Sequence, residues 1–334
     1  MIPVPRKVIE ALSSLYGCPS QALKHYGGGH NESDGVVYSY PTSEKTVLLK
    51  VIAIPVREKQ RGVLCLEERL RFSRFLGKNG APVVFPRLSP RGRHYETVSS
   101  DEHIWIGYSM DIAPGKTRKP HDCDAGFFRR WGASVGLMHR LSTGYPSWES
   151  SADPESGKHY LTWKEEWESF LAWCRDEDVK NEWRKIAGQL EQLPITREVY
   201  GFIHNDPHLW NLHDDGRHLT ILDFDVANHH WFINDIAIAC QSILFAQSGG
   251  MDKPVHHHDK LINFLTAFIE GYRSQYRILG EWLDRLDLFL SYRRILLFTA
   301  MYESIKRNGK NHESWKKMIL SGERVIGKLS GLLG

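Results

Sequence analysis

The pattern of apolar and polar positions divides the chain about one third of the way along its length. Val36–Tyr40 and Thr46–Ile54 are rich in β-branched residues and lie on either side of a short polar turn, which predicts a β-hairpin. Val63–Gly80 has apolar residues at helical spacing and ends in Asn-Gly, which predicts a helix. His103–Met110 is again typical of a strand, and Ala113-Pro114-Gly115 interrupts the pattern after it.

Beyond this interruption the pattern is mainly helical. Phe127–Leu141 has periodic apolar residues, and the tryptophan-rich stretch Trp163–Leu193 is amphipathic. Gly201–Ala227 differs from its surroundings, because short apolar runs alternate there with polar loops. From Asp235 to the end the spacing is helical again. The polar side chains that could carry chemistry are therefore concentrated in one short segment of strands and loops.

This order of elements predicts an α+β fold of two lobes. The small, β-rich N-terminal lobe covers residues 1–112, and the larger, mostly helical lobe covers residues 113–334. A hinge is expected near residues 110–115, at the interruption. A chain of 334 residues is long enough for both lobes to bury a core.

Composition excludes several classes of protein. The chain has 43 basic and 40 acidic residues, and this near balance gives no field that would favour nucleic acid or an anionic membrane. The five cysteines are scattered without a CxxC pair, which argues against a disulfide framework or a zinc site. The first residues lack the apolar core of a signal peptide, and Phe232–Ala246 is too short and too polar to span a membrane. We expect a cytoplasmic protein.

The segment with the most chemical information is HNDPHLWN, His204–Asn211. It places Asp206 two residues after a histidine and Asn211 five residues after Asp206, and the apolar run Leu219–Leu222 then ends in Asp223. Phosphoryl transfer needs a carboxylate that orients the attacking hydroxyl, and oxygen ligands for the Mg²⁺ that neutralises the triphosphate. A loop aspartate, a loop asparagine and a strand-end aspartate supply these groups. The alternative, that they are turn carboxylates of a polar hairpin, is favoured for any one of them but not for the set.

With these residues the chain resembles the aminoglycoside phosphotransferase and choline kinase superfamily, relatives of the eukaryotic protein kinases. The shared features are H-x-D-x-x-x-x-N and the strand end Asp223-Phe224-Asp225. The resemblance implies a protein-kinase-like fold, ATP and Mg²⁺ as cofactors, and Asp206 as the catalytic base. It further implies Asn211 as a catalytic residue and metal ligand, Asp223 as a metal ligand and Asp225 as an accessory acidic metal ligand. Asp235 would brace the catalytic loop.

Within the superfamily, the stretches DFDVA and FIEGYRSQY (Phe268–Tyr276) look most like a bacterial branch with type II homoserine kinases and a stress-response Ser/Thr kinase. Two positions depart from the pattern of the superfamily. Asn205 follows His204 where the family usually has glycine, and Trp210 replaces a commonly small residue. Neither change removes a group that the reaction needs, but Trp210 could narrow the acceptor pocket.

In the first lobe, Lys50 lies within an apolar strand, where an unpaired ammonium would be costly. Kinase-like folds pair such a lysine with ATP phosphates and with a glutamate on a helix. Glu68 is the predicted partner, with Glu67 as a close alternative, and Lys50 could instead extend to solvent from an edge strand.

Two other segments of the first lobe are candidates for nucleotide binding. Gly27-Gly28-Gly29, followed by His30 and Asn31, could bring backbone N–H groups to phosphate, with Gly28 and Gly29 as the candidate contacts. By the family resemblance alone, backbone groups from Met110 through Ile112 would hold adenine.

The acceptor is predicted to be the hydroxyl of a small molecule, because the superfamily mostly uses small molecules. Residues 226–334 have fourteen lysines and arginines against ten acidic residues, which disfavours a polycationic aminoglycoside. A protein Ser/Thr kinase and a nucleotide-binding scaffold without catalysis are the alternatives. His256–His258 is interpreted as a surface loop rather than a metal site, and the oligomeric state stays open.

Overall fold

The computed structural model divides the chain into two compact units, Met1–Pro114 and Gly115–Gly334. The described residues are 3–29, 35–146, 161–248, 258–307, 309–322, 324 and 326. None of the helices within these ranges is long and apolar enough to span a membrane.

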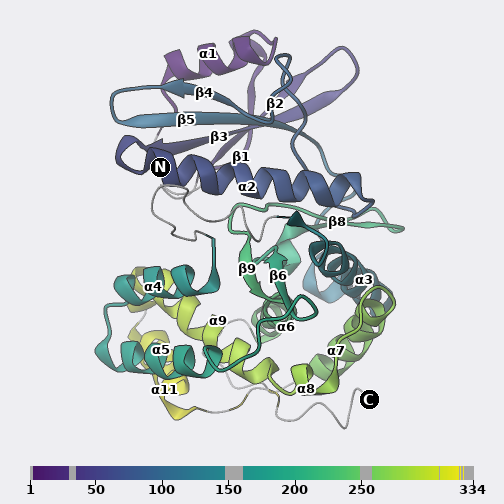
Figure 1. Cartoon of the computed structure of the whole chain (residues 1–334), viewed down its shortest axis with the longest axis vertical. Helices are drawn as coiled ribbons and strands as arrows, with labels where there is room; N and C mark the ends of the chain where they lie inside the picture. The colour runs from purple at the N-terminus through teal and green to yellow at the C-terminus, as the bar shows by residue number, and fades with distance from the viewer. Residues whose placement is uncertain are drawn as a thin grey trace. The chain divides into compact units, whose positions relative to one another are not determined.

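The first unit is a five-stranded antiparallel sheet in the strand order β1-β2-β3-β5-β4, with one α-helix of 10 residues and one of 20 (Figure 1). Its elements are α1 (Arg6–Leu15), η1 (Ser20–Ala22), β1 (Lys24–Gly28), β2 (Val36–Pro41), β3 (Thr46–Pro55), η2 (Val56–Glu58), α2 (Lys59–Lys78), β4 (Glu96–Ser99) and β5 (His103–Asp111). The predicted hairpin, helix and later strand are present. Strand β1 was missed because its sequence, KHYGG, has no apolar alternation.

Side-chain alternation along β3 assigns the two faces of this sheet. Val47, Leu49 and Val51 pack with α1 in one buried cluster. Ile52 and Ile54, on the other face, pack in a second cluster with α2. Because successive side chains of a strand point to opposite faces, Lys50 belongs to the face that α2 covers. Strand β3 lies between β2 and β5, so the edge-strand alternative for Lys50 is wrong.

The second unit is mostly helical, with two small antiparallel ribbons, β6-β9 and β7-β8 (Figure 1). Its strands and short helices are η3 (Pro120–Asp122), β6 (Tyr200–Ile203), η5 (Leu209–Asn211), β7 (Leu212–Asp214), β8 (Leu219–Ile221) and β9 (Asn228–Trp231). Its α-helices are α3 (Ala125–Ser142), α4 (Trp163–Trp173), α5 (Glu177–Leu190), α6 (Phe232–Ser248), α7 (His258–Arg273), α8 (Gly280–Leu283), α9 (Leu286–Ala300), α10 (Tyr302–Arg307) and α11 (Gly309–Ser321).

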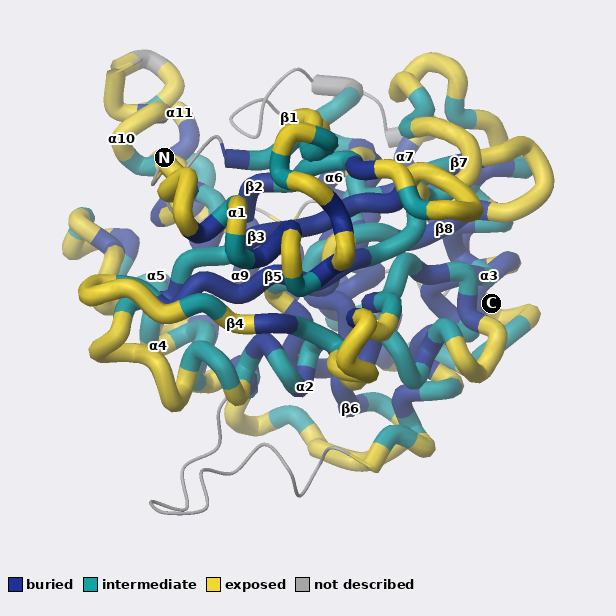
Figure 2. Tube along the Cα trace, turned by 90° about the horizontal axis from the view of Figure 1, so that it is seen from above, coloured by how far each residue is buried: buried dark blue, intermediate teal, exposed yellow. Residues whose placement is uncertain are grey.

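Helix α3 contacts a strand of each ribbon, β6 and β8, and helix α9 is buried within the same unit. Helices α3 and α7 approach closely at Gly132, where a Cβ atom would lie 1.9 Å from the carbonyl oxygen of Phe268. Helix α9 is buried along much of its length (Figure 2), and its buried side chains include the polar residues Tyr292, Arg293 and Arg294. Buried polar side chains need hydrogen-bond or ion-pair partners. The partner of Tyr292 is Glu166, and that of Arg293 is Asp206.

Candidate active site

The loop that follows β6 is held by the carboxylate of Asp235 on α6. Asp235 accepts hydrogen bonds from the backbone N–H of His204 at 3.2 Å and of Asn205 at 2.8 Å. The His204 ring also contacts the carbonyl oxygen of Leu222 at 2.7 Å, which joins the loop to the end of the β7-β8 ribbon. The bracing contact that the family resemblance implied for Asp235 is therefore present.

Asp235 is itself held by a buried chain of side chains. It contacts Nε2 of His139 at 3.0 Å, and both side chains have no exposed surface. A carboxylate only accepts hydrogen bonds, so Nε2 donates, and Nδ1 meets the Tyr272 hydroxyl at 2.9 Å. Burial raises the pKa of Tyr272 well above its ordinary value, so the hydroxyl keeps its proton.

The backbone angle and the contacts of Asn205 explain why asparagine can stand where the family usually has glycine. Its φ is +64°, in the left-handed region that glycine adopts freely and asparagine tolerates. Its side chain donates to Glu166 and to the carbonyl oxygen of Val226, and it accepts from Asn234 at 2.8 Å. Asparagine therefore keeps the required backbone conformation and adds three hydrogen bonds.

Glu166 on α4 is a residue that sequence reasoning missed. Its two carboxylate oxygens accept from Asn205, from Asn228 at 3.2 Å and from the Tyr292 hydroxyl at 2.7 Å. It thus joins α4, the catalytic loop, β9 and α9. No motif marks Glu166 in the sequence, because it follows another glutamate in an ordinary amphipathic helix.

Asp206, the predicted base, has a partly exposed side chain within reach of three other groups. The Asn211 amide donates to the backbone oxygen of Asp206 at 3.0 Å and contacts Oδ2 at 3.4 Å. His208 Nε2 also lies 3.4 Å from Oδ2, and Arg293 Nη2 lies 3.4 Å from Oδ1. Long contacts of this kind are common before a substrate binds. Arg293, which is far away in sequence, was not among the predicted site residues.

The backbone brings Asn211 and the predicted metal ligand Asp223 close together. The N–H of Leu222 donates to the carbonyl oxygen of Asn211 at 2.9 Å, and Asp223 is the next residue. Asp223 is exposed and has a φ of +61°. The backbone N–H of Asp225 donates to the carboxylate of Asp223 at 3.4 Å. Asp206, Asn211, Asp223 and Asp225 thus lie on two adjoining turns of the second unit.

In the first unit, Lys50 and Glu68 are both buried. Glu68 accepts from Arg71 at 3.1 Å, and it lies on the buried side of α2 with Leu66 and Leu70. Glu67 is less buried and contacts the Tyr95 hydroxyl at 3.3 Å. Since Lys50 is on the sheet face that α2 covers, burial favours Glu68 over Glu67 as its predicted partner.

The predicted glycine turn lies beside Lys50. Gly28 has a φ of +73°, and a Cβ atom there would lie 2.1 Å from the carbonyl oxygen of Gly35. Gly29 has a φ of +74° and donates to the same oxygen at 3.1 Å. A Cβ atom on Gly35 would lie 2.9 Å from Cε of Lys50, so the glycines and the lysine share one small region. His30 and Asn31 lie outside the described residues.

The predicted adenine segment forms the end of β5. Met110 pairs with Leu48 on β3, and Ile112 is exposed. Between them, Asp111 accepts from Arg87 at 2.7 Å and from Lys45 at 2.9 Å. Partial burial opposes its ionisation, but these two hydrogen bonds hold the pKa of Asp111 below its usual range.

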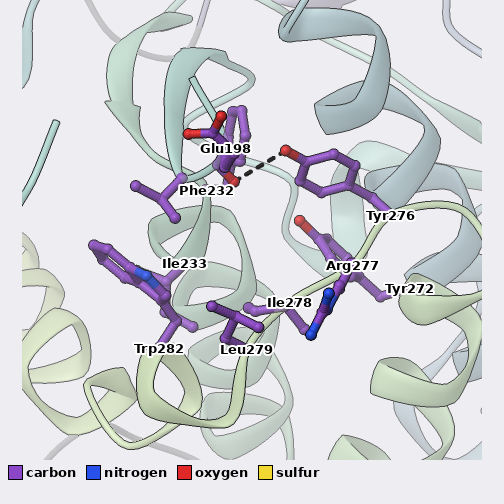
Figure 3. Close-up of a pocket in the computed structure, with 10 residues that line it drawn as sticks. Glu198, Phe232, Ile233, Tyr272, Tyr276, Arg277, Ile278, Leu279 and Trp282 are labelled. Atoms are coloured by element: carbon purple, nitrogen blue, oxygen red, sulfur yellow. Dashed lines mark hydrogen bonds between the residues drawn. The ribbon is translucent and has the colours of Figure 1, made fainter. Parts of the chain in front are cut away.

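A mainly apolar cavity of about 440 Å³ in the second unit is lined by none of the predicted site residues (Figure 3). Aromatic rings, among them Tyr272, Tyr276 and Trp282, line it together with Arg277. The Tyr276 hydroxyl donates to the backbone oxygen of Glu198 at 3.0 Å. The cavity lacks the cluster of acidic groups that phosphoryl transfer requires.

The histidine run His256–His258 is interpreted from the sequence as a surface loop. His256 and His257 lie outside the described residues, and His258 begins α7.

Similarity to known proteins defines the class of enzyme to which this chain belongs. Residues 48–282 match the model of the phosphotransferase enzyme family, and the chain belongs to that family. The predicted superfamily is therefore confirmed, as is the predicted enzyme class, a kinase that acts on a hydroxyl group. The resemblance to the homoserine kinase branch is not confirmed.

Particular relatives match almost the whole chain. The amicoumacin kinase of Bacillus subtilis (strain 168) is 26% identical over 322 residues, which cover 95% of this chain and 90% of that protein. The solved structure of the amicoumacin kinase hAmiN in complex with AMP-PNP, Ca²⁺ and Ami has a TM-score of 0.85 at 22% identity, covering 99% of this chain and 98% of that one. A microcompartment-associated aminopropanol kinase has a TM-score of 0.69 at 17% identity, covering 94% and 96%. These likenesses confirm the kinase-like α+β fold.

Proposed function

We propose that this chain transfers the γ-phosphate of ATP to a hydroxyl of a small molecule, with Asp206 as the base. The observation that carries this proposal is the arrangement of the two adjoining turns. The Asn211 side chain donates a hydrogen bond to the backbone oxygen of Asp206. The carbonyl oxygen of Asn211 accepts one from the N–H of Leu222, the residue before Asp223. A proton acceptor and two oxygen ligands are thereby fixed to one another, as phosphoryl transfer requires.

The donor set fits a magnesium ion that binds together with the nucleotide. Among the described residues, no three His, Cys, Asp or Glu side chains form a group that could hold a metal ion. Mg²⁺ usually binds one or two carboxylates and completes its coordination with phosphate oxygens and water. Asp223 offers a carboxylate, with Asp225 as the accessory acid. Asn211 donates through Nδ2 to Asp206, which leaves its Oδ1 to face a cation. When bound, the ion would neutralise phosphate charge.

In the proposed reaction, the protein acts by positioning and by accepting one proton. The acceptor hydroxyl donates to Asp206, and its oxygen bonds to the γ-phosphorus as the bond to the β,γ-bridging oxygen breaks. The hydroxyl proton passes to Asp206, and ADP leaves. In the N-terminal lobe, we assign Lys50 to the α- and β-phosphates, Glu68 to Lys50, the Gly28-Gly29 turn to phosphate, and the segment Met110–Ile112 to adenine.

The relatives indicate which acceptors to test first. ATP and Mg²⁺ as cofactors agree with AMP-PNP and Ca²⁺ in the hAmiN complex. Because the similarity to amicoumacin kinase extends over 95% of this chain, amicoumacin is the first candidate and aminopropanol the second. A polycationic aminoglycoside stays disfavoured, since residues 226–334 carry a basic surplus.

The test is an ADP-release assay with Mg·ATP and a panel of acceptors. The panel holds amicoumacin, aminopropanol, choline, hydroxy-amino acids, sugars, kanamycin and generic protein substrates. We expect turnover with at least one neutral or singly charged small molecule and none with proteins. Turnover of kanamycin alone would contradict the charge argument, and turnover of proteins alone would contradict the small-molecule assignment.

A further inference from the structure

Arg293 is a buried cation whose side chain lies beside the predicted base. It belongs to α9, and only 7% of its side-chain surface is exposed. Its Nη2 lies 3.4 Å from Oδ1 of Asp206. Its Nε is buried without a hydrogen-bond partner. Within the part of the chain that the structure describes, Asp206 is the one carboxylate within ion-pair distance of Arg293.

This environment is unusual for a structural arginine. A buried guanidinium loses its hydration, which is unfavourable unless hydrogen bonds and an opposite charge replace it. Two other arginines of the same unit have shorter ion pairs and are more exposed: Arg118 and Arg130 lie 2.7 and 2.9 Å from the carboxylate of Asp214, with 33% and 28% of their side-chain surface exposed. A methionine or leucine would fill a buried helix position without this cost. Stability alone therefore gives no reason for a cation at position 293.

The surroundings of Arg293 keep its charge directed at Asp206. Burial and, after it, the nearby charge of Arg293 lower the pKa of His230 well below its ordinary value. A neutral His230 does not repel the guanidinium. Tyr292, the preceding residue, is fixed by its hydrogen bond to Glu166, and this bond orients the turn of α9 that carries Arg293.

We propose that Arg293 is a positioning residue that orients the Asp206 carboxylate toward the acceptor hydroxyl. The guanidinium holds Oδ1, while Asn211 and His208 contact Oδ2 from another side. Because a misplacement of about 1 Å can reduce a rate about 10²-fold, a carboxylate on a loop needs such a fixed partner. This inference rests on the proposed role of Asp206 as the base.

A double-mutant cycle tests whether Arg293 acts through Asp206. Turnover is measured with the best small-molecule acceptor for the parent, Arg293→Met, Asp206→Asn and the double variant. We expect Arg293→Met to lower kcat about 10- to 100-fold with the KM for ATP within about two-fold. In the Asp206→Asn background the same change should have no further effect, because the group that it orients is already disabled. Arg293→Lys, which keeps a charged donor, should recover part of the loss.

The matched control is Arg294→Met, since Arg294 is the neighbouring buried arginine of the same helix. It should change thermal stability without the coupling to Asp206. Equal losses from Arg293→Met in the parent and in Asp206→Asn, or a kcat within two-fold of the parent, would overturn the inference alone. Nearly full activity of Asp206→Asn would overturn the proposed base and the inference together. If Arg293→Met does not fold, Arg293→Gln enters the same cycle, and the same two outcomes decide.

Discussion

Replacing Asn205 with glycine, the residue usual in the superfamily, tests how this chain holds its catalytic loop. The variant keeps the backbone conformation, because glycine adopts a φ of +64° without strain. It removes three hydrogen bonds, of which the one to Glu166 is charge-assisted. A neutral hydrogen bond contributes about 1 kcal/mol and a charge-assisted one about 1.5–3 kcal/mol. The relief of left-handed strain offsets part of this loss.

We therefore expect Asn205→Gly to lower the free energy of unfolding by about 3–4 kcal/mol. Asn205→Ala is the matched variant, since it removes the same hydrogen bonds but keeps a Cβ atom. It should cost about 1 kcal/mol more than glycine, because a left-handed backbone is strained for alanine. Denaturant unfolding of the parent and both variants measures the differences, provided that the transitions are cooperative.

Two results would refute this reasoning. If the glycine variant is as stable as the parent, the hydrogen bonds of Asn205 contribute nothing, and its network with Glu166 is incidental. If alanine and glycine are equally destabilising, the backbone at position 205 is not held in the left-handed region.

Three further predictions follow from other contacts. Asp235→Asn should lower the free energy of unfolding by about 3 kcal/mol and reduce turnover, because the new amide would face the backbone N–H groups and the His139 ring that now donate to the carboxylate. Thermal unfolding measures the first effect, and an ADP-release assay measures the second. Burial opposes ionisation of Asp214, but hydrogen bonds from the backbone and from two arginines lower the pKa of this carboxyl in the folded state. The ionised Asp214 should therefore stabilise the fold fully above about pH 4, the unfolded-state pKa. This stabilisation should be lost as the pH falls through the lower pKa of the folded state. Asp214→Asn should flatten that acid loss in urea titrations at several pH values. Asp223→Ala should weaken the binding of Mg·ATP but not of metal-free ATP in calorimetry, and equal losses for both would show that it is not a ligand.

That the candidate site residues lie close together could be predicted from the sequence, because these residues are local. Asp206, Asn211 and Asp223 lie within eighteen residues, and their spacing alone indicates a loop, a turn and a strand end. The position of Lys50 within an apolar strand likewise marked it as a candidate for pairing, although extension to solvent from an edge strand stayed open. Local patterns of this kind are set by the period of helix or strand, which can be read without knowing the tertiary structure.

The parts that could not be predicted depend on contacts between distant segments. Glu166 and Arg293 reach the catalytic loop from helices 39 and 87 residues away in sequence, and neither has a distinctive local motif. Asn205 was noticed as a departure, but its role needed the backbone angle and the partners Glu166 and Asn234. Strand β1 was missed because pairing with β2, rather than its own composition, makes it a strand.

The most direct test of the central claim is the turnover of Asp206→Asn with the best small-molecule acceptor. Phosphorylated product is followed by ³¹P NMR alongside ADP release, and ATP affinity is measured separately. Asp215→Asn is the control, since the Asp215 carboxylate contacts Arg217 and His218 within the turn between β7 and β8. We predict that Asp206→Asn lowers turnover about 10²–10⁴-fold with ATP affinity nearly unchanged, and that the control behaves like the parent. Turnover of Asp206→Asn within a few-fold of the parent would contradict the account.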